Sequence, residues 1–235
     1  MAKVSIIPAV LTTPYATILE AEPVAIVTDV IRATTTATTA VARGNRCIPV
    51  GSVEHAREEA TRRPEALLAG EQQGESVPGF HLGNSPAAVD RLEGETVILL
   101  SSSGTPVLHA TRAGPTVFIS CLRTTTATVR AAAREGRDIV ILPACTRGEF
   151  RDEDKLLAGW TVKQLLARGY EAADDFTRDT VDAWGDQAPS SILGSKSVKF
   201  LIEAGHQDDL DFIMERIDDL DFTIHLSEGE LVRYE

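Results

Sequence analysis

Short apolar runs alternate along this chain with longer segments in which apolar residues recur at helical spacing. The apolar runs have the length of strands and lead into turns rich in Gly, Ser and Thr. This alternation predicts an α/β fold with a mainly parallel, or mixed, sheet flanked by helices. The predicted strands cover residues 3–7, 24–27, 47–50, 66–69, 96–100, 116–121 and 139–142; the predicted helices cover 34–43, 53–63 and 152–168, with one more from Pro106, capped by Thr105, and one opened by residues 122–128 that stops near Gly136.

The pattern is weaker after Tyr170, and the form of residues 8–23 is not predicted. Residues 172–186 are acidic, 195–204 and 208–216 are predicted helices, and 222–225 and 231–233 form a predicted antiparallel pair. A chain of 235 residues is long enough for one α/β domain over residues 1–235. Two similar sub-lobes, residues 1–92 and 93–235, are the alternative.

Composition and charge exclude several classes of protein. Apolar residues make up 43% and charged residues 25%, as in a globular protein, and the formal net charge of −12 disfavours binding to nucleic acid. The apolar stretches are too short to span a membrane, and the N-terminus lacks the pattern of a signal peptide. We therefore expect a cytoplasmic protein with a small-molecule ligand. Cys47, Cys121 and Cys145 are typical of reduced core thiols.

The strand at residues 24–27 leads into a stretch that resembles an anion site. Asp29 and Arg32 follow the strand, and the hydroxyls of Thr34, Thr35 and Thr36 stand where the next helix begins. Unpaired backbone N–H groups at a helix N-terminus attract anions, and arginine adds a fixed cation. Asp29 would repel a bound anion, so either a divalent cation lies between them or the carboxylate itself attacks phosphorus.

Similar turns follow two further strands. Residues 101–105 are Ser-Ser-Ser-Gly-Thr, and residues 123–128 repeat the string Arg-Thr-Thr-Thr-Ala-Thr found at residues 32–38, with one residue removed. One Ser or Thr cluster at a helix start is most often a plain N-cap, but three such clusters after three strands favour a ligand site. In parallel sheets, ligands bind outside the carboxyl ends of the strands, so we expect these turns to meet.

Other acids and loops are candidates for the same edge. Glu71 lies between Gly70 and Gly74, and a loop at residues 79–86 starts a short helix with Ser85 as N-cap. Asp152, Glu153 and Asp154 share the first turn of a predicted helix, where they serve equally well as partners of the helix dipole or as metal ligands.

Taken together and in order, five motifs resemble the phosphosulfolactate phosphatase family over residues 20–160, with a looser match to the end. The resemblance implies a Mg²⁺-dependent phosphatase of the coenzyme M pathway type that hydrolyses the phosphate ester of a small 2-hydroxy acid, such as 2-phosphosulfolactate, and it makes a homodimer an expectation. The motifs are Asp29-Val-Ile-Arg-Ala-Thr-Thr-Thr36, Gly70-Glu-Gln-Gln-Gly74, Gly79-Phe-His-Leu-Gly-Asn-Ser-Pro86, Ser102-Ser-Gly-Thr105, and Thr146-Arg-Gly-Glu-Phe150 with Glu153-Asp154 and Ala158-Gly159.

The resemblance assigns roles by position. The acids Asp29, Glu71 and Asp154 match the metal ligands, and Asp29, Arg32 and Asp154 match the catalytic groups. Whether Asp29 is nucleophile or metal ligand stays open. The expected substrate and phosphate contacts are Thr34, Thr35, Asn84, Ser85, Ser102, Ser103, Gly104, Thr105, Arg123 and Arg147.

This chain departs from the family pattern at three positions. Gln72 and Pro106 stand where the family usually has arginine, and Arg123 and Arg147 can partly replace these cations. We hypothesise that phosphate hydrolysis survives while the sulfonate-bearing substrate does not. Cys145 stands where the family tends to have a small residue, and residues 145–151 fit the Cys-x-x-Gly-x-x-Arg spacing of cysteine phosphatases, a minor alternative.

Two other function classes remain alternatives. A non-catalytic protein that binds a phosphorylated metabolite would keep the hydroxyl turns but would not need three separated acids. A metal-dependent lyase acting on a hydroxy acid would release no phosphate.

Overall fold

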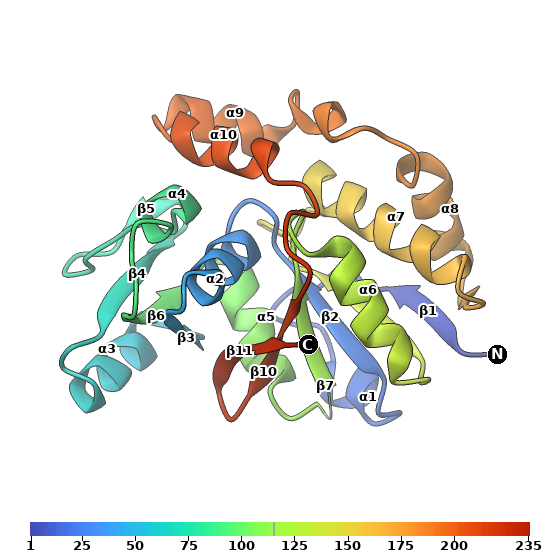
Figure 1. Ribbon diagram of the computed structural model, residues 1–235, viewed down its shortest axis with the longest axis horizontal. Helices are drawn as coiled ribbons and strands as arrows, with labels where there is room; N and C mark the ends of the chain where they lie inside the picture. Colours follow the sequence, from blue (N-terminus) through green and yellow to red (C-terminus); the bar gives the residue numbers. More distant parts are fainter. Residues whose placement is uncertain (115) are drawn as a thin grey trace.

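The computed structural model describes residues 1–114 and 116–235, which form one 11-stranded sheet covered by helices (Figure 1). The predicted α/β class with a mixed sheet is confirmed. The strands are β1 Lys3–Ile6, β2 Val24–Thr28, β3 Arg46–Val50, β4 Leu67–Gln72, β5 Glu75–Ser76, β6 Thr96–Leu100, β7 Thr116–Ser120, β8 Ile139–Pro143, β9 Glu171–Ala172, β10 Thr223–Ser227 and β11 Glu230–Tyr234. The helices are α1 Tyr15–Leu19, α2 Ala33–Ala42, α3 Val53–Arg62, α4 Pro86–Val89, α5 Gly104–Thr111, α6 Thr125–Arg134, α7 Asp152–Leu166, α8 Asp175–Trp184, α9 Lys196–Glu203 and α10 Gln207–Glu215, with a 3₁₀ turn at Pro189–Ile192.

The sheet consists of two parallel groups of strands joined by the C-terminal hairpin. The order is β5-β4-β6-β3-β11-β10-β7-β2-β8-β1-β9, in which β4, β6 and β3 are parallel to one another and β7, β2, β8, β1 and β9 are parallel to one another. The hairpin pairs antiparallel with β7 on one side and with β3 on the other. The predicted terminal strand pair is thus confirmed, although the sequence did not predict its place between the two groups.

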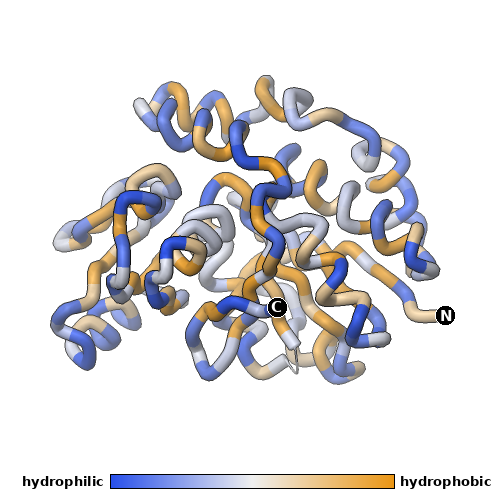
Figure 2. Tube along the Cα trace, in the orientation of Figure 1, coloured by the Kyte–Doolittle hydropathy of each residue, from blue (hydrophilic) through white to orange (hydrophobic). Residues whose placement is uncertain are grey.

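Helices α2 and α5 lie between the two groups of strands, and α3, α6 and α7 cover the outer faces (Figure 1). The central core joins Ala37 of α2 and Leu108 of α5 to Val27 of one group and Leu99 of the other. Figure 2 shows hydrophobic positions concentrated in the strands and hydrophilic positions along the outer helices. This packing fixes α2 and α5, so the loops that lead into them are held rigidly.

Some boundaries and elements differ from the prediction. Helix α5 begins at Gly104, with Ser103 at the N-cap position, so Thr105 lies inside the helix. The prediction that Thr105 caps a helix starting at Pro106 was wrong. The Thr105 hydroxyl instead accepts a hydrogen bond from the Ser101 amide at 2.8 Å, which closes the turn after β6. The acidic segment also contains a helix, α8, because Asp174 caps it by accepting from the Thr177 amide at 2.7 Å.

The C-terminal segment crosses back over the loops that follow the strands (Figure 1). Val198 and Leu201 of α9 pack with Leu210 of α10 against Ile31, which lies just beyond β2. This contact places α9 beside the turns in which the candidate residues lie. No helix within residues 1–114 and 116–235 is both long and apolar enough to span a bilayer.

Candidate active site

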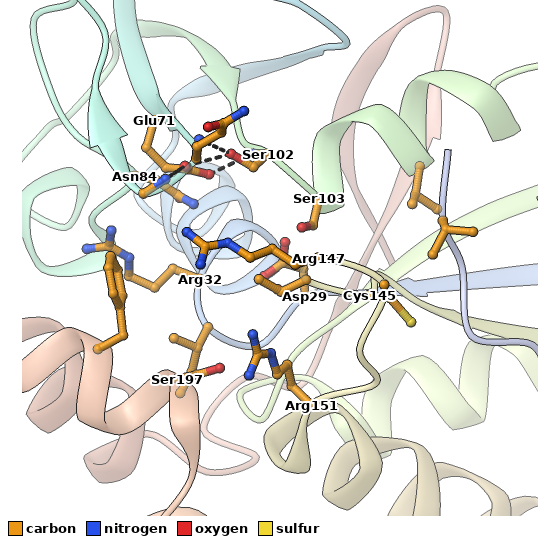
Figure 3. A pocket seen from close by; sticks show the side chains of 18 of the residues that line it. Asp29, Arg32, Glu71, Asn84, Ser102, Ser103, Cys145, Arg147, Arg151 and Ser197 are labelled. Atoms are coloured by element: carbon orange, nitrogen blue, oxygen red, sulfur yellow. Dashed lines mark hydrogen bonds between the residues drawn. The ribbon is translucent and has the colours of Figure 1, made fainter. Parts of the chain in front are cut away.

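A cavity of about 1000 Å³ opens where the loops after β2, β6 and β8 meet the end of β4 and helix α9 (Figure 3). Seven of the site residues predicted from the sequence line this cavity, and all have polar or charged side chains. They are Asp29, Arg32, Glu71, Asn84, Ser102, Ser103 and Arg147.

Asp29 lies at the meeting point of two helix N-termini. One carboxylate oxygen accepts from the Ala33 amide at the start of α2, at 3.3 Å, and Gly104 at the start of α5 packs directly against this side chain. A Cβ atom on Gly104 would lie 2.6 Å from the Asp29 carboxylate, so glycine is required there. Burial, with a further contribution from Glu71 and Glu153, nevertheless raises the pKa of Asp29 to about 7.

Thr34 and Thr35 are buried and use their hydroxyls on the Asp29 loop itself. The Thr34 hydroxyl lies 2.9 Å from the Asp29 carbonyl oxygen and 3.1 Å from the Asp29 amide, and the Thr35 hydroxyl donates to the Val30 carbonyl at 2.7 Å. Neither side chain is part of the cavity wall. These hydroxyls shape the loop that presents Asp29, where the sequence suggested direct phosphate contacts.

Arg32 lines the cavity and forms a buried ion pair with Asp209 of α10, at 2.6 Å. Asp209 also accepts from the Ser85 hydroxyl at 2.5 Å. Ser85 caps α4 as predicted, by accepting from the Ala88 amide at 3.1 Å, so its side chain is fully engaged. Asn84 faces the cavity, and its side-chain oxygen is buried without a hydrogen-bond partner in the described part of the chain.

Glu71 is tied to the turn after β6. Its carboxylate accepts from the Ser102 amide at 2.6 Å, from the Ser102 hydroxyl at 2.8 Å and from the Gly74 amide at 2.6 Å (Figure 3). Ser103 lines the same wall, with Thr105 behind it in the turn. The two Ser residues therefore reach the cavity from the start of α5.

Asp154 lies behind Asp29. It is 3% exposed and accepts from the Val30 amide at 3.0 Å and from the Thr28 hydroxyl at 3.3 Å. Burial first, then Glu153 and Asp29, raise the pKa of Asp154 well above its ordinary value. Within residues 1–114 and 116–235, no three His, Cys, Asp or Glu side chains are grouped as a metal site, so Asp29, Glu71 and Asp154 do not form one cluster.

The two arginines proposed as replacement cations have different positions. Arg147 and Gly148 are the central residues of a tight turn closed by Thr146 and Glu149, and both have positive φ, of 53° and 77°. This turn directs Arg147 into the cavity (Figure 3). Arg123 lies elsewhere, in an ion pair with Asp219 at 2.7 Å and a hydrogen bond to Thr39 at 3.1 Å.

Sequence reasoning missed part of the cavity wall. Arg151 was noted only within the Cys-x-x-Gly-x-x-Arg spacing, and Lys196, Ser197 and Phe200 of α9 carried no local signal. A Cβ on Gly74 would lie 2.8 Å from the Phe200 ring, so α9 meets the β4–β5 turn across the cavity. The contribution of α9 follows from the way the C-terminal segment crosses the sheet.

Cys145 lines the cavity but does not resemble a nucleophile. Burial, with Asp154 as a further cause, raises the pKa of its thiol to about 11. A nucleophilic cysteine requires a lowered pKa and positive surroundings. The cysteine-phosphatase alternative is therefore disfavoured.

An α/β scaffold that gathers helix N-termini, hydroxyls and arginines around a buried carboxylate defines an enzyme for small anionic substrates. The chain belongs to the 2-phosphosulpholactate phosphatase family, whose model matches residues 12–229, so it is a phosphatase of the phosphoric monoester hydrolase class. The resemblance noted over residues 20–160 is confirmed and extends through most of the chain.

Relatives of this chain carry the same family name. It is 31% identical to the 2-phosphosulfolactate phosphatase of Methanothermobacter thermautotrophicus, over 84% of both chains. It is 33% identical to a protein named probable 2-phosphosulfolactate phosphatase in Carboxydothermus hydrogenoformans, over 88% of both chains, and 33% identical to one of the same name in Thermotoga maritima, over 80% of this chain and 82% of the other.

Proposed function

We propose that this chain is a Mg²⁺-dependent phosphatase that hydrolyses the phosphate ester of a small 2-hydroxy acid, with 2-phosphosulfolactate as the first substrate to test. The observation that carries the proposal is the position of Asp29, at the bottom of the cavity and between the N-termini of α2 and α5. The names of the family and of its relatives support the same reaction.

Phosphoryl transfer needs positioned positive potential and hydrogen-bond donors more than it needs covalent chemistry from the protein. In this cavity Ser103, the residue just before α5, offers a hydroxyl that makes no capping hydrogen bond, while Arg32 supplies a cation fixed by Asp209. The phosphoryl group would rest between these donors, with Asp29 beside the phosphorus. Asp154 would act through the Thr28 hydroxyl and the Val30 amide, both of which donate to it, as a positioning residue.

The donor set fits a magnesium ion. Mg²⁺ in phosphoryl-transfer sites is held by one or two carboxylates, several waters and substrate phosphate oxygens, so a three-acid cluster is not required. Asp29 and Glu71 both line the cavity, so two carboxylates are available to such an ion. When bound there, the ion would polarise the phosphoryl oxygens and lower the pKa of Asp29.

The hypothesis that the enzyme rejects a sulfonate-bearing ester depended on how many cationic side chains face the substrate. Arg123, one of the cations that it considered, lies outside the cavity. Two cations that it did not consider, Arg151 and Lys196, line the cavity. The cavity contains enough cations for a substrate with more than one acid group. We therefore include 2-phosphosulfolactate as a substrate on equal terms with phospholactate and phosphoglycolate.

The test is phosphate release from these three esters, with Mg²⁺ or with EDTA, by the wild type, Asp29→Asn and Asp152→Asn. We expect release that requires the metal and falls on the order of 10³-fold in Asp29→Asn, because a charged group at the reacting centre is lost. Asp152→Asn is the matched control, since Asp152 is on the same helical turn as Asp154 but is exposed and paired with Lys155. Undiminished release by Asp29→Asn, or in EDTA, would contradict the proposal.

The same enzyme can separate the two roles left open for Asp29. A rapidly quenched reaction with labelled substrate should trap an acyl phosphate if Asp29 attacks phosphorus. The absence of any trapped label, under conditions in which the substrate turns over, would assign Asp29 to metal binding.

A further inference from the structure

Three cations line the side of the cavity opposite Glu71 and Ser102. Arg147 and Arg151 come from the loop after β8, and Lys196 comes from the first turn of α9. Figure 3 shows the side chains of Arg147 and Arg151 extending into the cavity from the wall that faces Glu71. Glu149 is in an ion pair with both Arg151 and Lys196, so these four side chains together carry more positive than negative charge.

Arg151 is held in place but is not satisfied. Its side chain is 13% exposed, and its Nε and Nη1 atoms are buried without a hydrogen-bond partner among the described residues. Glu149 lies 3.2 Å from Nη1, which is close enough for an ion pair but lacks hydrogen-bond geometry. Buried guanidinium donors without acceptors are costly, so an anionic ligand is the natural acceptor here.

Lys196 and Glu149 link the loop to α9. The ammonium group of Lys196 lies 2.7 Å and 2.9 Å from the two carboxylate oxygens of Glu149. This bridge leaves Arg147 without an ion pair or hydrogen bond in the described part of the chain. Ser197, the next residue on α9, adds a hydroxyl at the same wall (Figure 3).

We propose that Arg151, with Arg147 and Lys196, forms a second anion subsite that binds the acid group of the substrate, and that Arg151 determines the preference for phosphate esters that carry one. The proposal rests on the proposed function, because it places the phosphoryl group at Asp29. A carboxylate or a sulfonate group a few bonds from the ester oxygen fits the same chemistry. A guanidinium group binds the paired oxygens of either group in a planar, two-pronged contact.

The experiment compares three esters of similar size: phosphoglycolate, which carries a carboxylate; the phosphate ester of 2-hydroxyethanesulfonate, which carries a sulfonate; and ethyl phosphate, which carries neither. The kcat/KM ratio of each acid ester to ethyl phosphate is measured in the wild type, Arg151→Gln, Arg151→Lys and Arg147→Gln. Lys199→Gln is the matched control, because it removes one cation from α9 outside the cavity wall.

We expect Arg151→Gln to lower the ratio for at least one acid ester by about tenfold or more, mainly through KM, with partial rescue in Arg151→Lys and no change in Lys199→Gln. The acid ester whose kcat/KM ratio falls more carries the acid group that this subsite binds. Equal effects of Arg151→Gln on all three esters, or no effect on any, would overturn the proposal. Arg147→Gln is on an exposed turn and gives the same comparison if Arg151→Gln does not fold.

A binding measurement separates this inference from the proposed function. Calorimetric titration with phosphonoacetate and with methylphosphonate, neither of which is an ester, reports the subsite even if no ester is cleaved. A loss of the phosphonoacetate preference in Arg151→Gln supports the subsite in a protein without phosphatase activity. An unchanged preference overturns the subsite and leaves the phosphatase proposal standing.

Discussion

The two related strings, Arg32-Ala-Thr-Thr-Thr36 and Arg123-Thr-Thr-Thr126, stand at corresponding places in the fold and have different roles. Each follows one of two adjacent parallel strands, β2 and β7, with Thr28 paired to Ser120 in register, and each opens a helix, α2 or α6. Both arginines are buried and both form an ion pair with an aspartate of the C-terminal segment. Only the copy at Arg32 lines the cavity.

The second copy shows which ligand this geometry binds. The amide and hydroxyl of Thr126, at the start of α6, both donate to the Asp218 carboxylate at 2.8 Å, and Arg123 donates twice to Asp219 at 3.0 Å and 2.7 Å. The chain therefore supplies its own anions to this copy. A helix start with an adjacent arginine is a carboxylate site whenever a carboxylate can reach it.

The first copy has an acid directly after its strand, and the second copy does not. Asp29 stands where the second copy has Cys121, so a carboxylate already faces the start of α2 and a neighbouring helix, α5, meets it from the other side. The Thr-rich helix start is thus a scaffold common to both copies, and Asp29 and the loop after β6 distinguish the copy that lines the cavity from the copy that does not.

The largest expected difference between the copies comes from their arginines. Arg32→Gln should lower kcat/KM about 100-fold, since a fixed cation at the reacting phosphoryl group is lost. Arg123→Gln should leave kcat/KM close to the wild-type value and lower the unfolding free energy by about 2 kcal/mol, the loss of hydrogen bonds to a charged group. Steady-state kinetics and urea unfolding of both variants check this.

A control keeps the two effects apart. Arg32→Gln also leaves Asp209 buried and unpaired, which costs about 3 kcal/mol, so its kinetics must be measured where the folded fraction is complete. A comparable loss of kcat/KM in Arg123→Gln would show that the two copies do not differ in the way described.

A smaller difference should appear in the dependence of stability on pH. The pKa of Asp29 is raised in the fold to about 7 from 3.8, so the folded state holds a proton that the unfolded state has already released. In EDTA, the unfolding free energy should therefore fall as pH rises from about 4 to about 7 and become level above that. Denaturant unfolding across this range measures the slope.

The second copy has no acid at the matching position, so the slope should belong to the first copy alone. Asp29→Asn should flatten the decline and raise stability at alkaline pH. Asp154 and Glu153, whose pKa values are also raised, contribute with the same sign, so some slope should remain. A profile in Asp29→Asn that matches the wild type would refute the assignment.

The smallest expected effect concerns the internal anion of the second copy. Asp218→Asn removes the charge at the start of α6 and retains a hydrogen-bond acceptor, so it should lower the unfolding free energy by about 0.5 kcal/mol at low salt and less at high salt. Phosphate release should not change. A larger loss of activity than of stability would indicate that α6 contributes to catalysis.

Most of the fold was predictable because strand-sized apolar runs and capped helices are local signals. The strand ending at Thr28 and the helix starting at Ala33 lie within a residue or so of their predicted bounds, and Asp29, Arg32, Asn84 and Ser103 do line one cavity. The roles of Thr34, Thr35 and Ser85 were not predictable, since a hydroxyl at a helix start can bind either a ligand or its own backbone, and tertiary packing decides between them.

The remainder of the site depended on long-range contacts. The pairs Arg32–Asp209 and Arg123–Asp219 join residues far apart in sequence, and α9 reaches the cavity only because α9 and α10 pack on Ile31. The insertion of β10 and β11 between β7 and β3 likewise leaves no local pattern beyond two short strands. Such pairings need either a structure or many related sequences.

The position of the hairpin formed by β10 and β11 has a consequence for folding. The strands β3 and β7 each expose an unpaired edge until β10 and β11 pair with them, and these two strands follow all the other strands of the sheet in the sequence. Open sheet edges are templates for pairing with other chains, so the protein is prone to aggregate until the hairpin is in place. A variant that lacks residues 223–234 would then yield insoluble chains that retain every residue lining the cavity.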